Sequence, residues 1–181
     1  MTIYLETDRL RMRDWREEDF APFAALNADD KVMKYFPARL NRKQSDAYIG
    51  RIQHGLDDNG FGFYAVEEKS TQRFIGFVGL SHVRFPAAFT PAVEIGWRLA
   101  VSAWGQGFAT EAASACLANG FYIFGIREIV SFTAHQNTPS IAVMDRIGMT
   151  RNPADDFDHP SLPTGHKLRP HVLYRAENPA P

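Results

Sequence analysis

The chain has 181 residues, of which 45% are hydrophobic and 23% charged, so it is long enough for one domain with a sizeable core. Its formal net charge is −1 and its pI is about 6.6, which gives no electrostatic reason to expect binding to nucleic acid or to an acidic membrane. The single cysteine, Cys116, excludes an internal disulfide. No signal-peptide pattern or bilayer-spanning apolar run is present, so we expect a cytoplasmic protein.

The first part of the chain predicts a strand and two helices. Arginine and apolar side chains alternate over residues 9–13, a pattern typical of a strand with one solvated face. Residues 16–30 then place carboxylates in the first turn of a helix, where the helix dipole favours negative charge. A second helix is predicted to begin after Asn41, because Gln44 completes a capping box, and to stop at the DDNG sequence before Phe61.

Strands dominate the middle of the chain. Residues 61–68 and 73–83 have the composition of strands and are joined by the polar turn KSTQ, so they predict a β-hairpin. Two prolines indicate a loop over residues 85–91. The next strand is predicted over residues 92–100.

The later part of the chain alternates helices and strands. An alanine-rich helix is predicted over residues 108–124, ending at a glycine, followed by a strand over 127–134. A further helix is predicted over 139–148, with proline in its first turn. Residues 151–170 are rich in Pro, Asp and His and indicate a long loop before a last strand over 171–177.

The order of these elements predicts a single α/β domain spanning residues 1–181. The two late strand–helix–strand steps predict right-handed crossovers between parallel neighbours. The early hairpin predicts antiparallel pairing, so the sheet should be mixed.

Two glycines, Gly105 and Gly107, precede the alanine-rich helix in the sequence WGQGFATEA. Backbone N–H groups at a helix start are unpaired, so such a turn can hold phosphate. A Walker loop is excluded because Phe108 stands where lysine is needed, and a Rossmann fingerprint fits poorly because Thr110 occupies its third small position. The pyrophosphate of coenzyme A and a tight turn without a ligand remain as alternatives.

The same turn resembles the Gln/Arg-x-x-Gly-x-Gly/Ala motif of the GNAT superfamily of N-acetyltransferases. Trp104 stands in the Gln/Arg position, Gly107 in the glycine position and Ala109 in the final small position. The stretches TDRLRMRDWREEDF, EIGWRL and NTPSIAVMDRIGM extend the resemblance over residues 7–149. They are similar to the branch that acetylates the N-termini of ribosomal proteins and to its small-molecule relatives.

The resemblance implies a mixed, mostly antiparallel twisted sheet with flanking helices, in which two central parallel strands splay apart to admit acetyl-CoA as cosubstrate. The pantetheine arm would pair with backbone like an added strand, the glycine turn would hold the pyrophosphate, and residues 152–170 would form an acceptor-side loop. The cofactor-binding residues that it implies are Leu99, Ala100, Val101, Trp104, Gly105, Gln106, Gly107, Phe108, Ala109, Thr110, Asn137 and Ser140.

Glu94 is the candidate general base. An alkylammonium has a pKa near 10, so a base or a water chain must take its proton before the amine attacks a thioester. Glu94 lies in an apolar strand beside the expected cleft, where partial burial would raise its pKa. The alternative is a structural carboxylate paired with a neighbouring strand. A backbone N–H near Leu99 is the expected donor to the developing oxyanion.

Ser140 is the candidate acid for the departing thiolate. Many members of the family carry a tyrosine seven residues after the asparagine that matches Asn137, but Met144 occupies that position. The resemblance points to Ser140 as the substitute, and the alternative is that this serine only caps a helix turn.

The histidines of the tail, at positions 159, 166 and 171, match no standard zinc spacing, so no metal is expected. The tail is interpreted either as a loop that selects a cationic amine or as a solvated loop.

Taken together, the residues and the resemblance predict an acetyl-CoA-dependent N-acetyltransferase. Its acceptor is expected to be a primary amine, either a protein N-terminus or a small molecule such as a polyamine, an amino acid or a drug. Transfer of a longer acyl group and a non-catalytic CoA-binding sensor are the alternatives. A homodimer is compatible with the sequence, and neither nucleic acid nor membrane is an expected partner.

Overall fold

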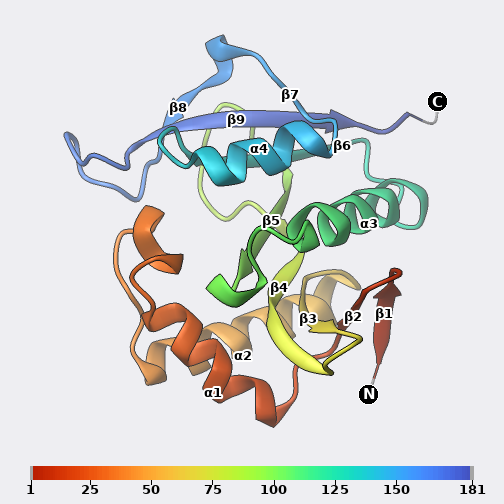
Figure 1. Ribbon diagram of the computed structural model, residues 1–181. Coiled ribbons are helices and arrows are strands. Elements are labelled where there is room, and N and C mark those ends of the chain that lie inside the picture. Colours follow the sequence, from red (N-terminus) through yellow and green to blue (C-terminus); the bar gives the residue numbers. More distant parts are fainter. Residues whose placement is uncertain (1, 180–181) are drawn as a thin grey trace.

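The computed structural model describes residues 2–179, which form one nine-stranded mixed sheet with helices on both faces (Figure 1). The strands are β1 (Ile3–Glu6), β2 (Leu10–Arg13), β3 (Phe63–Glu68), β4 (Arg73–His82), β5 (Val93–Leu99), β6 (Glu128–Ala134), β7 (Thr150–Arg151), β8 (Phe157–Asp158) and β9 (Pro170–Glu177). The helices are α1 (Glu17–Ala28), α2 (Arg42–Asn59), α3 (Phe108–Tyr122) and α4 (Thr138–Arg146), with the 3-10 turns η1 (Val32–Tyr35), η2 (Val101–Ala103) and η3 (Pro153–Asp155).

The sheet is mixed and mostly antiparallel, as predicted. Its order is β1-β2-β3-β4-β5-β6-β9-β7, and β8 pairs with β9 outside this path. Within the described residues only β5 and β6 pair in parallel. The predicted hairpin is β3–β4, and the capping box of α2 is present, with the Asn41 side chain accepting from the Gln44 N–H at 2.9 Å.

The two faces of the sheet are covered by different helices. On β4, Phe77 points towards α1 and α2, where its ring contacts the rings of Phe23 and Tyr48. Leu80 points to the other face, where it packs against Gly120 of α3. Because side chains alternate along a strand, residues of β5 that lie opposite Phe77 or Gly79 share the face of α1 and α2.

Three sequence predictions need correction. The last strand, β9, is antiparallel to β6 rather than parallel. The tail after α4 first forms β7 and then reverses direction, so that β9 lies between β6 and β7 in the sheet. The alanine-rich helix ends at Tyr122, two residues early. The tail itself is less irregular than predicted, since it contains η3 and β8 and buries Leu162 and Leu168 against Ala134.

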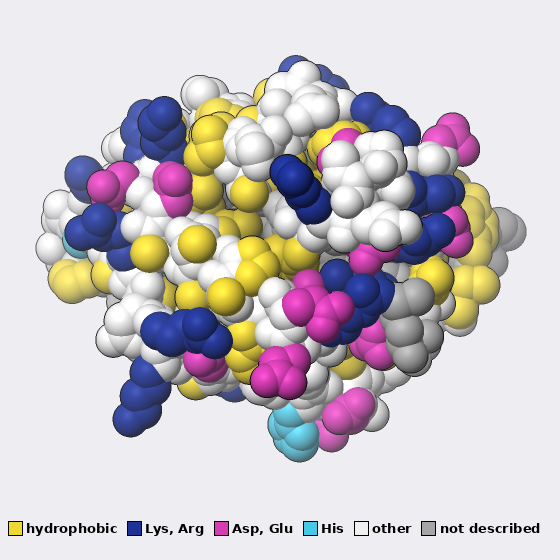
Figure 2. Space-filling model, turned by 60° about the horizontal axis from the view of Figure 1, so that its bottom comes forward, with side chains coloured by type: hydrophobic (Ala, Val, Ile, Leu, Met, Phe, Trp, Pro, Cys, Tyr) yellow, Lys and Arg dark blue, Asp and Glu magenta, His cyan; other side chains and the backbone are white. Residues whose placement is uncertain are grey.

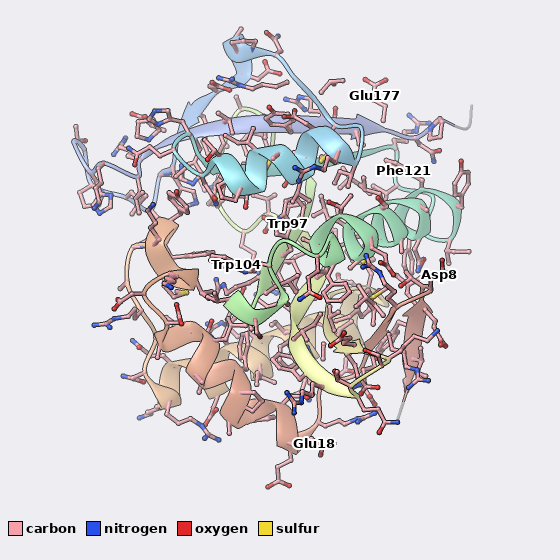
Figure 3. The ribbon with its side chains drawn as sticks, in the orientation of Figure 1. Asp8, Glu18, Trp97, Trp104, Phe121 and Glu177 are labelled. Atoms are coloured by element: carbon pink, nitrogen blue, oxygen red, sulfur yellow. The ribbon has the colours of Figure 1, made fainter. Side chains whose placement is uncertain are left out.

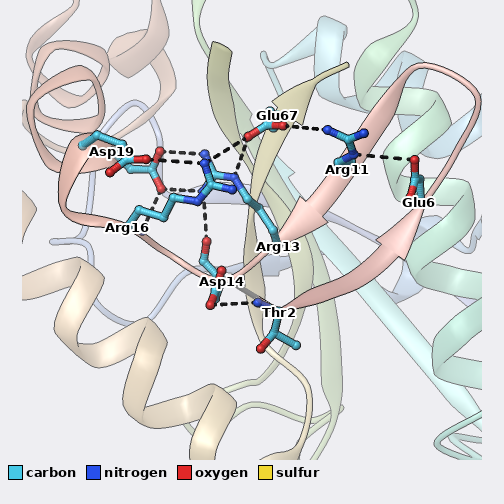
Figure 4. Close-up of polar contacts among 9 residues, drawn as sticks. Thr2, Glu6, Arg11, Arg13, Asp14, Arg16, Asp19 and Glu67 are labelled. Atoms are coloured by element: carbon cyan, nitrogen blue, oxygen red, sulfur yellow. Dashed lines mark hydrogen bonds and ion pairs between the residues drawn. The ribbon is translucent and has the colours of Figure 1, made fainter. Parts of the chain in front are cut away.

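The face of β2 that was predicted to be solvated carries a buried arginine. Arg13 is 1% exposed and its guanidinium donates to both carboxylate oxygens of Asp19, at 2.7 and 2.9 Å, and to Glu67 at 2.9 Å (Figure 4). The start of α1 folds over this end of the strand and buries Arg13, while Arg11, on the same face, remains partly exposed beside Glu67. Two carboxylates therefore neutralise one buried cation.

No helix within residues 2–179 has both the length and the apolar composition needed to cross a membrane.

Replacing Arg13 with leucine should destabilise the protein by about 3–5 kcal/mol, because Asp19 would remain buried without its cation and Glu67 would keep only the more exposed Arg11 and Arg16. Urea unfolding at neutral pH measures this free energy. The control is Arg42→Leu, which removes an exposed i,i+4 pair with Asp46 and should cost less than about 0.5 kcal/mol. Equal losses in the two variants would contradict the assigned role of Arg13.

Candidate active site

The site begins where β5 and β6 separate. Their parallel pairing is limited to Val93 with Ile129 and Glu94 with Val130. At the next position the Ser131 hydroxyl donates to the Ile95 carbonyl at 3.0 Å, so a side chain replaces the strand ladder. Beyond this point the two strands part, as the resemblance implied.

A cleft of about 1030 Å³ lies along the separated strands. Its walls come from β5, β6, η1, α4 and the start of α3, and they include Trp97 and Trp104, which lie centrally between the two halves of the molecule (Figure 3). Figure 2 shows apolar side chains gathered across the middle of one face of the molecule, with Lys and Arg side chains around them. The volume is that of a site for a large small-molecule ligand.

The glycine turn lies at one end of this cleft, at the N-terminus of α3. Gly105 and Gly107 both have positive φ, at +72° and +79°, a conformation that favours glycine. A Cβ at Gly105 would meet no atom within 4 Å, and one at Gly107 would meet only the Arg9 guanidinium at 3.5 Å. Within the described residues, the backbone N–H groups of 105–110 donate to no protein acceptor, so the turn presents free donors beside open space.

Residues of the N-terminal segment between β1 and β2 hold this turn in place. The Thr7 hydroxyl and the Arg9 Nε each donate to the Glu111 carboxylate at 2.6 Å, and Arg9 also donates to the Gln106 carbonyl at 2.9 Å. Burial alone would raise the pKa of Glu111, but these hydrogen bonds outweigh it and lower the pKa. Sequence reasoning missed this anchor, although Thr7 and Arg9 belong to a stretch that carries the family resemblance.

Nine of the twelve residues predicted to bind the cofactor line the cleft, namely Leu99, Trp104, Gly105, Gly107, Phe108, Ala109, Thr110, Asn137 and Ser140. Ala100, Val101 and Gln106 lie outside that lining. The Ala100 N–H donates to Ile75 at 2.8 Å, and the Leu99 carbonyl accepts from the Trp104 indole at 2.9 Å. These two groups are thus engaged within the protein.

The start of α4 forms the opposite wall. Asn137 caps the helix, since its side chain accepts from the Ser140 N–H at 3.4 Å and donates to the Thr133 hydroxyl at 2.8 Å. The Ser140 hydroxyl forms no hydrogen bond among the described residues and its side chain lines the cleft. Met144, at the tyrosine position of the family, is buried in the same wall.

Glu94 lies where the strands part, on the face of α1 and α2. It lines the cleft, and its carboxylate forms no hydrogen bond or ion pair within residues 2–179. Burial raises the pKa of Glu94 to about 7. The alternative of a carboxylate paired with a neighbouring strand therefore finds no partner in the structure.

Two further polar side chains enter the cleft from this face. Arg98 lies opposite Phe77, is 8% exposed and donates to the Asn27 side chain at 2.6 Å. Tyr48 of α2 also lines the cleft. The signal that could have identified Arg98 is the one that identified Glu94, a charged residue in an otherwise apolar strand.

Aromatic rings close the other end of the cleft. Phe132, His159 and His171 line it, and they pack with Phe85 and Phe157 at ring distances between 4.6 and 6.4 Å. Burial lowers the pKa of His159 and lowers that of His171 to about 4, so both are neutral at physiological pH. No group of three or more metal-binding side chains occurs among the described residues.

The parted strands, the glycine turn and the cleft are the features that the resemblance implied for an acyltransferase fold. The model of the acetyltransferase (GNAT) domain family matches residues 9–150, so the chain belongs to this family and is an acetyl-CoA-dependent N-acetyltransferase. It is 32% identical to the uncharacterized protein YkkB of Bacillus subtilis strain 168, over 80% of this chain and 84% of that protein. It is 28% identical to the uncharacterized N-acetyltransferase YnaD of the same strain, over 91% of each.

Solved structures share the fold over nearly the whole chain. A GNAT-family acetyltransferase from Bacillus anthracis superposes with a TM-score of 0.78 at 23% identity, covering 98% of this chain and 99% of that one. Spermidine N-acetyltransferase from Vibrio cholerae, in complex with CoA and spermine, gives 0.74 at 18% identity, covering 95% and 97%. RimL, a ribosomal L7/L12 α-N-protein acetyltransferase in complex with CoA, gives 0.76 at 18% identity, covering 97% and 98%.

Replacing Glu94 with glutamine should stabilise the protein above pH 7 and leave its stability unchanged below pH 4.5. The folded pKa is about 7 against 4.5 for an ordinary glutamate, so the folded state of the natural protein binds the extra proton between these values. Its stability therefore falls as pH rises from 4.5 to 7, by at most about 3 kcal/mol, and the glutamine variant lacks this loss.

Urea unfolding of both proteins at pH 5 and pH 8 measures the difference. A difference that does not change with pH would show that Glu94 is not desolvated in the folded protein.

Proposed function

We propose that this enzyme acetylates a primary amine by direct attack on the thioester of acetyl-CoA, with the cofactor in the cleft between β5 and β6. The observation that carries the proposal is the juxtaposition in one cleft of unpaired N–H groups at the start of α3 with a desolvated carboxylate, Glu94. The unpaired N–H groups suit the binding of pyrophosphate, and the carboxylate suits the role of proton acceptor.

Each part of acetyl-CoA has a group of the protein that suits it along the cleft. The free N–H donors of residues 105–110, at the positive end of α3, suit the pyrophosphate. The parted edges of β5 and β6 offer backbone groups to the amides of the pantetheine arm, as an added strand does. The cap residue Asn137 and the hydroxyl of Ser140 lie on the facing wall, within the same lining.

Residues on both walls of the cleft support the chemistry. As the amine nitrogen forms its bond to the carbonyl carbon, it gives up a proton, for which Glu94 is the acceptor, directly or through a water. The carbon–sulfur bond breaks with its electron pair on sulfur, and the Ser140 hydroxyl is the candidate donor to that thiolate. Backbone N–H groups near Leu99, other than that of Ala100, are the candidate donors to the carbonyl oxygen.

Two alternatives are tested by an assay of CoA release with a panel of amines and acyl-CoA donors. A longer acyl group would be accepted if the cleft has room beyond the acetyl position, so propionyl-CoA and butyryl-CoA belong in the panel. A non-catalytic sensor would bind acetyl-CoA without releasing CoA in the presence of any amine. The positions of Glu94 and Ser140 in the lining of the cleft favour the enzyme.

Acetyl-CoA at 100 times its Kd should stabilise the protein by about 2.7 kcal/mol, measured as a rise in Tm. Ala109→Asp should abolish most of this rise, because a carboxylate in the first turn of α3 repels pyrophosphate while it suits the helix dipole. Ser114→Asp, which adds the same charge to an exposed position of α3, is the matched control and should keep the rise. An equal rise in both variants would contradict this placement of the cofactor.

Glu94→Gln should lower kcat/KM for an accepted amine by about 100-fold or more at pH 8. The ratio of the natural enzyme to the variant should increase through pH 7, where Glu94 ionises, and level off above it. Taking the ratio removes the titration of the amine, which both proteins share. A ratio that is constant from pH 6 to 9 would assign the proton to another acceptor.

A further inference from the structure

We propose that the acceptor amine also carries a carboxylate and that Arg98 binds this group. The inference rests on the proposed function, because it names the substrate class of the same cleft. It starts from an imbalance of charge: a buried guanidinium lines the cleft, and no carboxylate of the described residues pairs with it.

Arg98 has only a neutral partner within residues 2–179. Its Nη1 donates to the Asn27 side chain at 2.6 Å, and its Nε is buried without a hydrogen-bond acceptor. Asn27 is itself fully buried and held by the Ser45 hydroxyl at 2.9 Å. The guanidinium is thus held by neutral groups, among them three aromatic rings in cation–π contact, while no anion faces it and part of its donor capacity remains unused.

Arg13 shows how the same chain neutralises a buried arginine that has no ligand to bind. Its guanidinium meets the carboxylates of Asp19 and Glu67 and lies outside the cleft. A buried charge without such compensation is costly, and burial lowers the pKa of Arg98. A ligand that brings a negative charge into the cleft would compensate the charge of Arg98.

The surroundings of Arg98 prepare it for a planar anion. The guanidinium lies 4.1 Å from the centre of the Phe36 ring, 5.4 Å from that of Phe77 and 5.6 Å from that of Tyr48. These rings limit its motion and exclude water, and they bring no negative charge. Arginine held in this way can present two parallel N–H donors to a carboxylate.

The spacing along β5 relates this anion to the reacting amine. Glu94 and Arg98 share one face, and four residues of strand separate their Cα atoms by about 13 Å. Gly96 lies between them without a side chain, and the ring of Phe63 packs over it, 3.3 Å from where a Cβ would stand, so the floor between the two charged residues is apolar. A molecule with its amine towards Glu94 and its carboxylate towards Arg98 spans this floor.

The other charges of the cleft agree with an anionic group on the acceptor. Lys31, Lys34 and Arg146 line it, and Glu94 is the one carboxylate among its described lining residues. A polyamine would need several carboxylates and finds one. We therefore expect this enzyme to differ in its acceptor from the spermidine N-acetyltransferase that shares its fold.

The test uses matched acceptors with CoA release as the readout. Glycine, leucine, 4-aminobutanoate and 6-aminohexanoate are each compared with the corresponding carboxamide, at saturating acetyl-CoA, and spermidine is included. Rates are compared per unprotonated amine, because the amide changes the pKa of an α-amine. For at least one pair, kcat/KM for the carboxylate should exceed that for the carboxamide by about 10- to 100-fold, with spermidine poorer than either.

Arg98→Met should reduce this discrimination to about threefold or less, through KM more than kcat, and Arg98→Lys should retain part of it. The acetyl-CoA thermal shift, measured on each variant, shows that the fold and the cofactor site persist. Arg51→Met is the matched control, since Arg51 is exposed, lies 5.3 Å from the centre of the Tyr48 ring and does not line the cleft, so its loss should leave the discrimination unchanged.

Equal use of carboxylates and carboxamides by the natural enzyme would overturn the inference and leave the proposed function standing. Discrimination that persists in Arg98→Met would do the same, because another group would then bind the anion. If no amine in the panel releases CoA while the thermal shift is present, the proposed function fails and the inference fails with it.

Discussion

The early end of the parallel pairing between β5 and β6 is the constraint on which the site depends. Two residue pairs join these strands, and the Ser131 hydroxyl then takes the place of the next backbone bond to Ile95. The strands on either side stay continuous, because β5 remains paired with β4 and β6 with β9 along their lengths. A sheet can therefore open in its middle without losing its order, and the opened edges are the backbone groups that a bound ligand can complete.

Buried charged side chains around this opening are of two kinds, those with ionic partners and those without. Away from the cleft, Arg13 is enclosed by carboxylates, and the network ties β2 and β3 to the start of α1. Within the cleft, Glu94 and Arg98 stand on one strand face without ionic partners among the described residues. Buried charge is costly unless it is compensated, and this is why we propose that a substrate engages these two groups.

Local signals accounted for much of the fold. The capping box at Asn41, the hairpin around KSTQ and the glycine turn before α3 each follow from a few neighbouring residues, whose preferences hold in almost any context. Predictions that needed distant partners were less accurate. The direction of β9 depends on where the tail reverses, and the burial of Arg13 depends on α1 folding over β2, which no alternating pattern encodes.

By itself, the sequence determined the order of its main elements and the place of the glycine turn, because these depend on periodicity, helix capping and a local motif. The class of protein followed from its resemblance to the GNAT superfamily. The sequence also singled out Glu94, as a carboxylate in an apolar strand. Only the tertiary structure decided which charges are compensated, since that depends on residues far apart in the chain, such as Asn27 with Arg98 and Thr7 with Glu111. The floor between Glu94 and Arg98 exists because folding brings α1, η1 and α2 against β5, and that contact turns a charged strand residue into a candidate binding group.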